Sequence, residues 1–218
     1  MLTSIAIREV FSTGVLEQIM NDNNAQRLGT GLLGLIAVVL GPNVVLAHTG
    51  VNPAHDLLHG LQHPVSGLDH ILAMFAVGMW AAQRGGRALW LVPLTFVGVM
   101  MIGGAIGMAG VSIPFVEQGI VLSVIILGVL VAAAVRLPLA VSAAIAGCFA
   151  IAHGYAHGAE IPSTASGVSY ALGFAASTLV LVGSGVAFGL GLQRIRYSQL
   201  IRLAGAATAI CGLYLGIR

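Results

Sequence analysis

Apolar residues run in long stretches along this chain, and short polar breaks separate the stretches. A helix needs roughly 17 to 25 apolar residues to cross a bilayer. Stretches of about that length lie near residues 28–47, 64–82, 88–109, 118–135, 138–158, 166–192 and 199–217. The pattern predicts an all-α fold, a polytopic bundle of transmembrane helices.

The composition supports a membrane environment. Hydrophobic residues make up 58% of the chain and charged residues only 7%, whereas an ordinary soluble domain has roughly 25% charged residues. The 30 glycines suit membrane helices, where small residues let backbones approach closely. No linker or low-complexity tract divides the chain, so we expect one compact membrane domain.

The first apolar stretch has the features of a leader. Arg27 precedes the apolar run 31–40, and the run is followed by Val45-Leu46-Ala47, with small residues placed as in a signal-peptidase site. We expect residues 1–47 to be an N-terminal leader and signal peptide, and residues 48–218 to be a six-helix membrane domain that begins at His48. The alternative is that the first stretch stays as an extra, uncleaved helix.

The arginines predict the orientation, because positive charge is retained on the cytoplasmic side and the chain has no lysine. Six of the nine arginines fall in three loops that alternate along the chain: Arg84 and Arg87, then Arg136, then Arg194, Arg196 and Arg202. Beyond residue 47, only the terminal Arg218 lies on the other side. The loops between them, near 48–66, 110–117 and 159–165, contain none. We expect a multi-pass protein of a bacterial cytoplasmic membrane with these three intervening loops facing outward.

All seven histidines fall on the predicted outer side, together with several carboxylates: His48, His55, His59, His63, His70, His153, His157, Asp56, Asp69, Glu117 and Glu160. Ionisable groups inside a membrane are costly and commonly mark an ion or proton path. The outer face is therefore the candidate functional face.

The first candidate motif spans His63 to His70. Pro64 stands where the first turn of a helix tolerates a missing N–H. His63 and His70 are seven residues apart and are predicted to share one face of that helix, with Gly67 leaving space between them and Asp69 adding charge.

The second motif lies at the outer end of a later helix. His153, His157 and Glu160 have i, i+4 and i+7 spacing, which places two imidazoles and a carboxylate on one face. Imidazole with carboxylate suits nickel, cobalt, zinc or copper(II), whereas magnesium and calcium prefer oxygen ligands. One buried histidine is usually hydrogen-bonded to a carbonyl, but two spaced sets with acidic partners favour a metal site.

Three further histidines and one carboxylate carry less weight. A new N-terminus at His48 would place an amine beside an imidazole, a potential pair of ligands. Glu117 is equally well explained as a site residue or as a partner of a helix N-terminus. His55 and His59 fit either a metal-capture segment or a solvated amphipathic turn.

The two motifs are expected to form one site. Asp69 and His70 are adjacent, so on a straight helix they diverge by about 100 degrees and cannot both face the same ion. Residues of the second motif, at the same membrane depth, can supply the missing ligands.

Both motifs resemble those of the HupE/UreJ family of hydrogenase and urease accessory membrane proteins. The resemblance covers residues 45–218 and includes Met74, Val77-Gly78 and Phe149 around the motifs. It implies a small secondary permease for nickel, or in some members cobalt, that feeds metalloenzyme assembly. By motif position it assigns function to His63, Asp69, His70, His153, His157 and Glu160, and less securely to Glu117.

Transport of Ni²⁺, or of Co²⁺ or Zn²⁺, is therefore the expected function, with the lipid bilayer and the metal ion as partners, no catalytic cofactor and no nucleic acid. The alternative is a membrane-embedded metalloenzyme, a zinc lipid hydrolase or a di-iron type, because His-x-x-x-His occurs at 55–59, 59–63 and 153–157. Against an enzyme, neither a His-His pair nor His-Glu-x-x-His is present.

Overall fold

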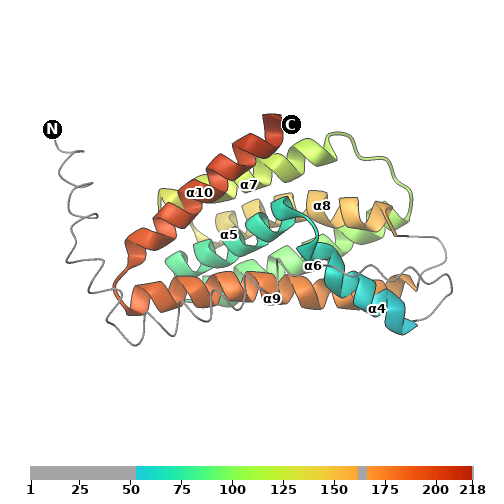
Figure 1. Ribbon diagram of the computed structural model, residues 1–218, viewed down its shortest axis with the longest axis horizontal. Helices are drawn as coiled ribbons and strands as arrows, with labels where there is room; N and C mark the ends of the chain where they lie inside the picture. The colour runs from blue at the N-terminus through green and yellow to red at the C-terminus, as the bar shows by residue number, and fades with distance from the viewer. Residues whose placement is uncertain (1–52, 162–165, 218) are drawn as a thin grey trace. The chain divides into compact units, whose positions relative to one another are not determined.

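A computed structural model describes residues 53–161 and 166–217, and these residues are helical (Figure 1). The elements are α4 (Pro53–Gln62), the 3-10 helix η1 (His63–Val65), α5 (Leu68–Arg84), α6 (Ala88–Met108), α7 (Val116–Ala132), α8 (Leu139–Ala159), α9 (Gly167–Arg194) and α10 (Ser198–Ile217). No strand occurs within these two ranges, so the predicted all-α fold is confirmed. The predicted leader, its cleavage site and His48 lie outside the described residues.

Four of the helices, α6, α8, α9 and α10, are long and apolar enough to cross a membrane. A fifth span is possible where α4 and η1 join α5, although this pair is sharply bent. Helix α7 is apolar but has 17 residues. The membrane bundle is confirmed, whereas the number of six spanning helices stays a prediction.

The helices pack in neighbouring pairs, α6 with α8, α7 with α10, and both α4 and α5 with α9 (Figure 1). The α6–α8 contact depends on small residues. A Cβ atom at Gly154 would collide with the carbonyl oxygen of Met100, and one at Gly158 with that of Gly104. Such backbone contact is how membrane helices gain packing energy in lipid. It also fixes the helix that carries His153 and His157 against α6.

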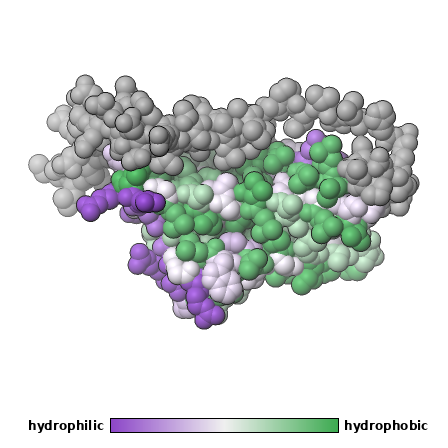
Figure 2. Space-filling model, turned by 90° about the horizontal axis from the view of Figure 1, so that it is seen from below, coloured by the Kyte–Doolittle hydropathy of each residue, from purple (hydrophilic) through white to green (hydrophobic). Residues whose placement is uncertain are grey.

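The three arginine-containing loops lie together at one end of the bundle. Side chains near the end of α5 and at the ends of α9 and α10 donate hydrogen bonds to backbone carbonyls there: Trp80 Nε1 to Val135 (2.9 Å), Gln83 Nε2 to Val131 (3.0 Å), Gln193 Nε2 to Ala82 (3.1 Å) and Arg202 Nε to Ala132 (2.8 Å). Figure 2 shows apolar surface along the helices and hydrophilic surface gathered toward one end. The predicted grouping of these loops on one side is confirmed.

The segment that carries the first histidine motif is bent, which corrects one expectation. Residues 56–65 and 68–84 meet at an angle of 78°. Ser66 closes a 3-10 turn by donating from both its N and its Oγ to the carbonyl of His63 (3.1 and 2.6 Å), and Gly67 is extended (φ −105°, ψ 125°). The prediction that Pro64 opens the long helix, with His63 and His70 on one straight face, is therefore wrong.

Candidate metal site

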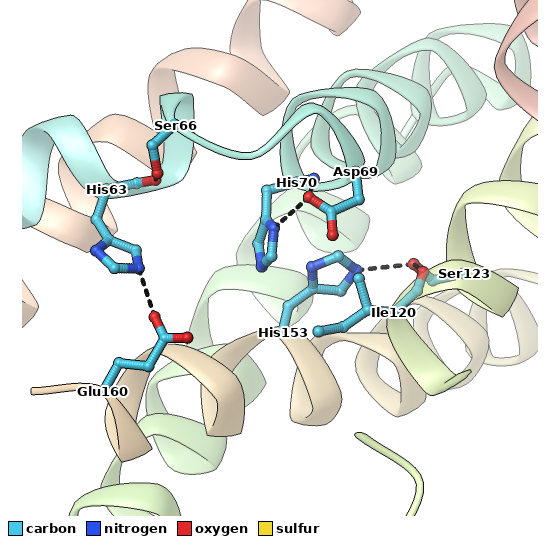
Figure 3. A network of polar contacts seen from close by, with 8 residues as sticks. All are labelled: His63, Ser66, Asp69, His70, Ile120, Ser123, His153 and Glu160. Carbon is cyan, nitrogen blue, oxygen red and sulfur yellow. Dashed lines mark hydrogen bonds and ion pairs between the residues drawn. The ribbon is translucent and has the colours of Figure 1, made fainter. Parts of the chain in front are cut away.

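The two histidine motifs meet at the end of the bundle opposite the arginines. The His63 ring, on η1, lies 3.0 Å through Nε2 from Glu160 Oε2, at the end of α8 (Figure 3). His63, His157 and Glu160 each offer one ligand atom, and the three atoms lie within 4.8 Å of one another. The bend after Val65 is what turns His63 toward α8.

The histidine rings form a row from the surface into the core. His63 contacts His157 (ring centroids 4.5 Å apart), His157 contacts His70 (4.2 Å), and His70 contacts His153 (4.7 Å). His63 is partly exposed, and His153 is fully buried. An ion bound among these rings could therefore move inward without leaving imidazole nitrogens.

Asp69 orients His70. One carboxylate oxygen, Oδ1, lies 2.8 Å from both His70 Nδ1 and the His70 backbone N–H (Figure 3). With the proton on Nδ1, the lone pair of His70 is at Nε2, which is buried and has no hydrogen-bond partner among the described residues. A Cβ atom at Gly67 would lie 2.6 Å from the same carboxylate oxygen, so glycine leaves room for this pair.

Ser123 orients His153 in the same way. The Ser123 hydroxyl donates its only proton to the carbonyl of Ile120 (2.6 Å), so it can only accept from His153 Nε2 at 2.7 Å. The lone pair of His153 is then at Nδ1, a buried atom that no described group contacts by a hydrogen bond. Figure 3 shows this nitrogen facing His70. Carboxylate and hydroxyl partners of this kind fix the tautomer of metal-binding histidines.

His157 completes the row. Its side chain is 4% exposed, and neither ring nitrogen has a hydrogen-bond partner among the described residues. The Phe174 ring packs against it at a centroid distance of 4.4 Å. Because buried polar atoms are almost always satisfied, the unpartnered nitrogens of three neighbouring imidazoles need an explanation, and a cation supplies one.

A cavity of about 240 Å³ opens onto these groups. Its lining includes both motifs and the start of α7: His63, Ser66, Gly67, Asp69, His70, Glu117, Ile120, Ala156, His157 and Glu160. Glu117 is thus placed on the wall of the same cavity as an exposed carboxylate. Three carboxylates near the histidines give this end of the bundle a negative lining.

Some residues near the site could not be found from the motifs. Ser123 stands in an apolar stretch of α7 and has no motif of its own. Tyr170 is 2% exposed, with its ring 5.8 Å from that of His63 and its hydroxyl unpartnered in the described ranges. The His59 ring lies 5.8 Å from His63, at the rim, whereas the side chain of His55 lies outside the described residues.

The fold and this site together define a polytopic membrane protein with buried histidines and more exposed carboxylates gathered at one end. Comparison with known proteins agrees with this class. The family described as "HupE / UreJ protein" matches residues 36–215. "Protein HupE" of Rhizobium leguminosarum bv. viciae is 43% identical over 181 residues, which cover 81% of this chain and 92% of that protein.

The chain therefore belongs to the HupE/UreJ family, a family of hydrogenase and urease accessory membrane proteins. No solved structure matches the chain.

Proposed function

We propose that the protein is a secondary permease that carries a divalent transition-metal ion, Ni²⁺ first and Co²⁺ next, across the membrane into the cytoplasm. The observation that supports this most is the pair of buried lone pairs at His70 Nε2 and His153 Nδ1. Each is set by a hydrogen bond on the opposite nitrogen, and Figure 3 shows the two rings turned toward each other. A purely structural histidine has no need for this arrangement.

The ion would first meet the outer set, His63, His157 and Glu160. These three groups replace part of its water shell, and the carboxylate offsets the cost of bringing a dication into a low-dielectric bundle. The hydrogen bond between His63 and Glu160 must open for both to bind the ion. Capture therefore exchanges one internal contact for metal ligation.

The ion would then pass to the inner set. His157 touches both His63 and His70, so it can hold the ion while the outer ligands leave and the inner ligands arrive. Sequential sites of moderate affinity allow entry without trapping, which conduction requires. The next ligands of the ion on this route would be His70 and His153.

The donor set gives the proposed selectivity. Imidazole nitrogen favours nickel, cobalt, copper(II) and zinc, while magnesium and calcium prefer oxygen ligands. The inward direction rests on the arginine-rich end being cytoplasmic, as the positive-inside rule predicts. The histidines then face the outside, where the ion is collected.

Uptake by reconstituted vesicles tests the proposal. The full chain is placed in liposomes, and entry of radioactive nickel is followed with cobalt, zinc or magnesium as competitor. We expect saturable uptake that cobalt inhibits and magnesium does not, and no saturable uptake with His70→Ala. Uptake no faster than in empty vesicles contradicts the proposal, and metal-dependent lipid hydrolysis in its place favours the enzyme alternative.

A further inference from the structure

The end of the bundle opposite the histidines holds a second polar cavity, of about 300 Å³. Four parts of the fold line it: α5, the α7–α8 connection, α9 and α10. The lining residues are Gln83, Ala134, Arg136, Gln193, Ser198, Ile201 and Arg202. None of them belongs to the histidine site.

Among the residues that the structure describes, this end carries positive charge and no carboxylate. It carries Arg84, Arg87, Arg136, Arg194, Arg196 and Arg202, whereas the described carboxylates, Asp56, Asp69, Glu117 and Glu160, belong to the segments at the histidine end. Within residues 53–161 and 166–217, no arginine forms an ion pair. An anion at this end would therefore be attracted by several uncompensated charges.

The cavity also has a defined pattern of donors and acceptors. Arg202 uses Nε to hold the carbonyl of Ala132 at 2.8 Å, which anchors its guanidinium group while the terminal nitrogens keep their donors. Gln83 donates through Nε2 to Val131, and its carbonyl oxygen Oε1 is buried without a partner among the described residues. Arg136 is exposed and makes no hydrogen bond inside the described chain. The cavity thus brings two guanidinium groups together beside the side chains of two glutamines.

We propose that this cavity binds the headgroup of an anionic phospholipid. The phosphate oxyanion is recognised by Arg136 and Arg202, and the net negative charge of a headgroup such as that of phosphatidylglycerol, which phosphatidylcholine lacks, favours binding at this end. Leu203, the residue after Arg202 on α10, is 57% exposed and offers apolar surface for an acyl chain. Retention of positive charge inside explains why arginines are on this side, but not why two of them line one cavity.

A bound headgroup would connect four parts of the bundle in addition to the helix packing and the hydrogen bonds that already join them. The lipid would hold the α7–α8 connection against α9 and α10. This role is separate from metal transport and does not depend on it.

Native mass spectrometry of the purified full chain tests the site. Phosphatidylglycerol and phosphatidylcholine with the same acyl chains are compared on the parent protein and on Arg136→Gln, Arg202→Gln and Arg87→Gln. We expect the parent to retain phosphatidylglycerol preferentially, and each cavity substitution to lower its affinity roughly tenfold. Arg87→Gln is the matched control, because it removes the same charge from the same end without lining the cavity, and it should leave binding within about twofold.

Three results would overturn the proposal. Equal retention of the two lipids would show that the protein does not recognise the headgroup. A similar loss with Arg87→Gln would show general attraction by the charged end. If inorganic phosphate displaced the lipid and raised the unfolding temperature of the protein as much as the lipid does, the ligand would be a free anion. Arg136→Gln keeps the test decisive if Arg202→Gln does not fold, because Arg136 makes no hydrogen bond to another described residue.

Discussion

Ser123→Ala is the substitution that separates a histidine prepared for metal from one that is simply buried. Ser123 lies on α7 and does not line the cavity at the histidine site. It contacts His153 through the ring nitrogen that faces away from His70. Removing the hydroxyl leaves His153 Nε2 without its 2.7 Å partner. The ring is then free to change tautomer or to turn.

The size of the effect follows from this role. Loss of the hydrogen-bond partner of a metal-binding histidine commonly lowers metal affinity by about 10- to 100-fold. The hydroxyl also makes an i−3 bond to the carbonyl of Ile120 at 2.6 Å, so part of any change could reflect the helix alone. Ser184→Ala isolates that part, because Ser184 makes the same bond to Leu181 at 2.6 Å and has no histidine partner.

The assay is nickel binding by isothermal titration, with the thermal unfolding of each variant measured alongside. We expect Ser123→Ala to weaken nickel binding about 10- to 100-fold and Ser184→Ala to leave it unchanged. The midpoint of thermal unfolding should fall more in Ser123→Ala, because the buried His153 Nε2 loses its partner. Equal nickel affinity in the two variants would refute the reasoning, because His153 would then not depend on the orientation that Ser123 gives it.

Three further predictions concern topology, processing and packing. A cysteine placed in the 84–87 loop should resist a membrane-impermeant probe in intact cells, and labelling there would contradict an inward arginine end. Terminal sequencing of the membrane-extracted protein should find His48 first, whereas recovery of residues 1–47 on the mature chain would contradict cleavage. Gly154→Ala should lower the midpoint of thermal unfolding by a shift equivalent to about 1–3 kcal/mol, since its Cβ collides with α6. Gly98→Ala, which has nothing within 4 Å of its Cβ, is the control and should unfold like the parent.

The helices could be predicted because the length of an apolar stretch is a direct requirement of the bilayer. The predicted stretch 88–109 became α6, Ala88–Met108, and the stretch 138–158 became α8, Leu139–Ala159. The sequence also predicted which end of the bundle carries the arginines and which carries the histidines, because the loops that contain arginine alternate with loops that do not.

The arrangement within the site was less accessible. A helical repeat assumes a straight helix, so it could not anticipate the 3-10 turn at Ser66 and the extended Gly67 that bend the first motif. The pattern indicated that Asp69 and His70 diverge, but not that the carboxylate folds back onto the ring of His70. The role of Ser123 could not be predicted, because a serine in an apolar helix is common. Only the packing of α7 against α8 brings it to His153.

The central claim is that both histidine motifs bind the same ion, and saturable nickel uptake by a double-mutant set tests it most directly. His70→Ala, Glu160→Ala and the double variant are reconstituted in vesicles and compared with the parent at matched amounts of folded protein. Residues that act as one unit are non-additive, so each single change should abolish saturable uptake and the double variant should be no worse. Losses that multiply, or saturable uptake that survives either single change, would show that the two motifs work separately and would contradict the account.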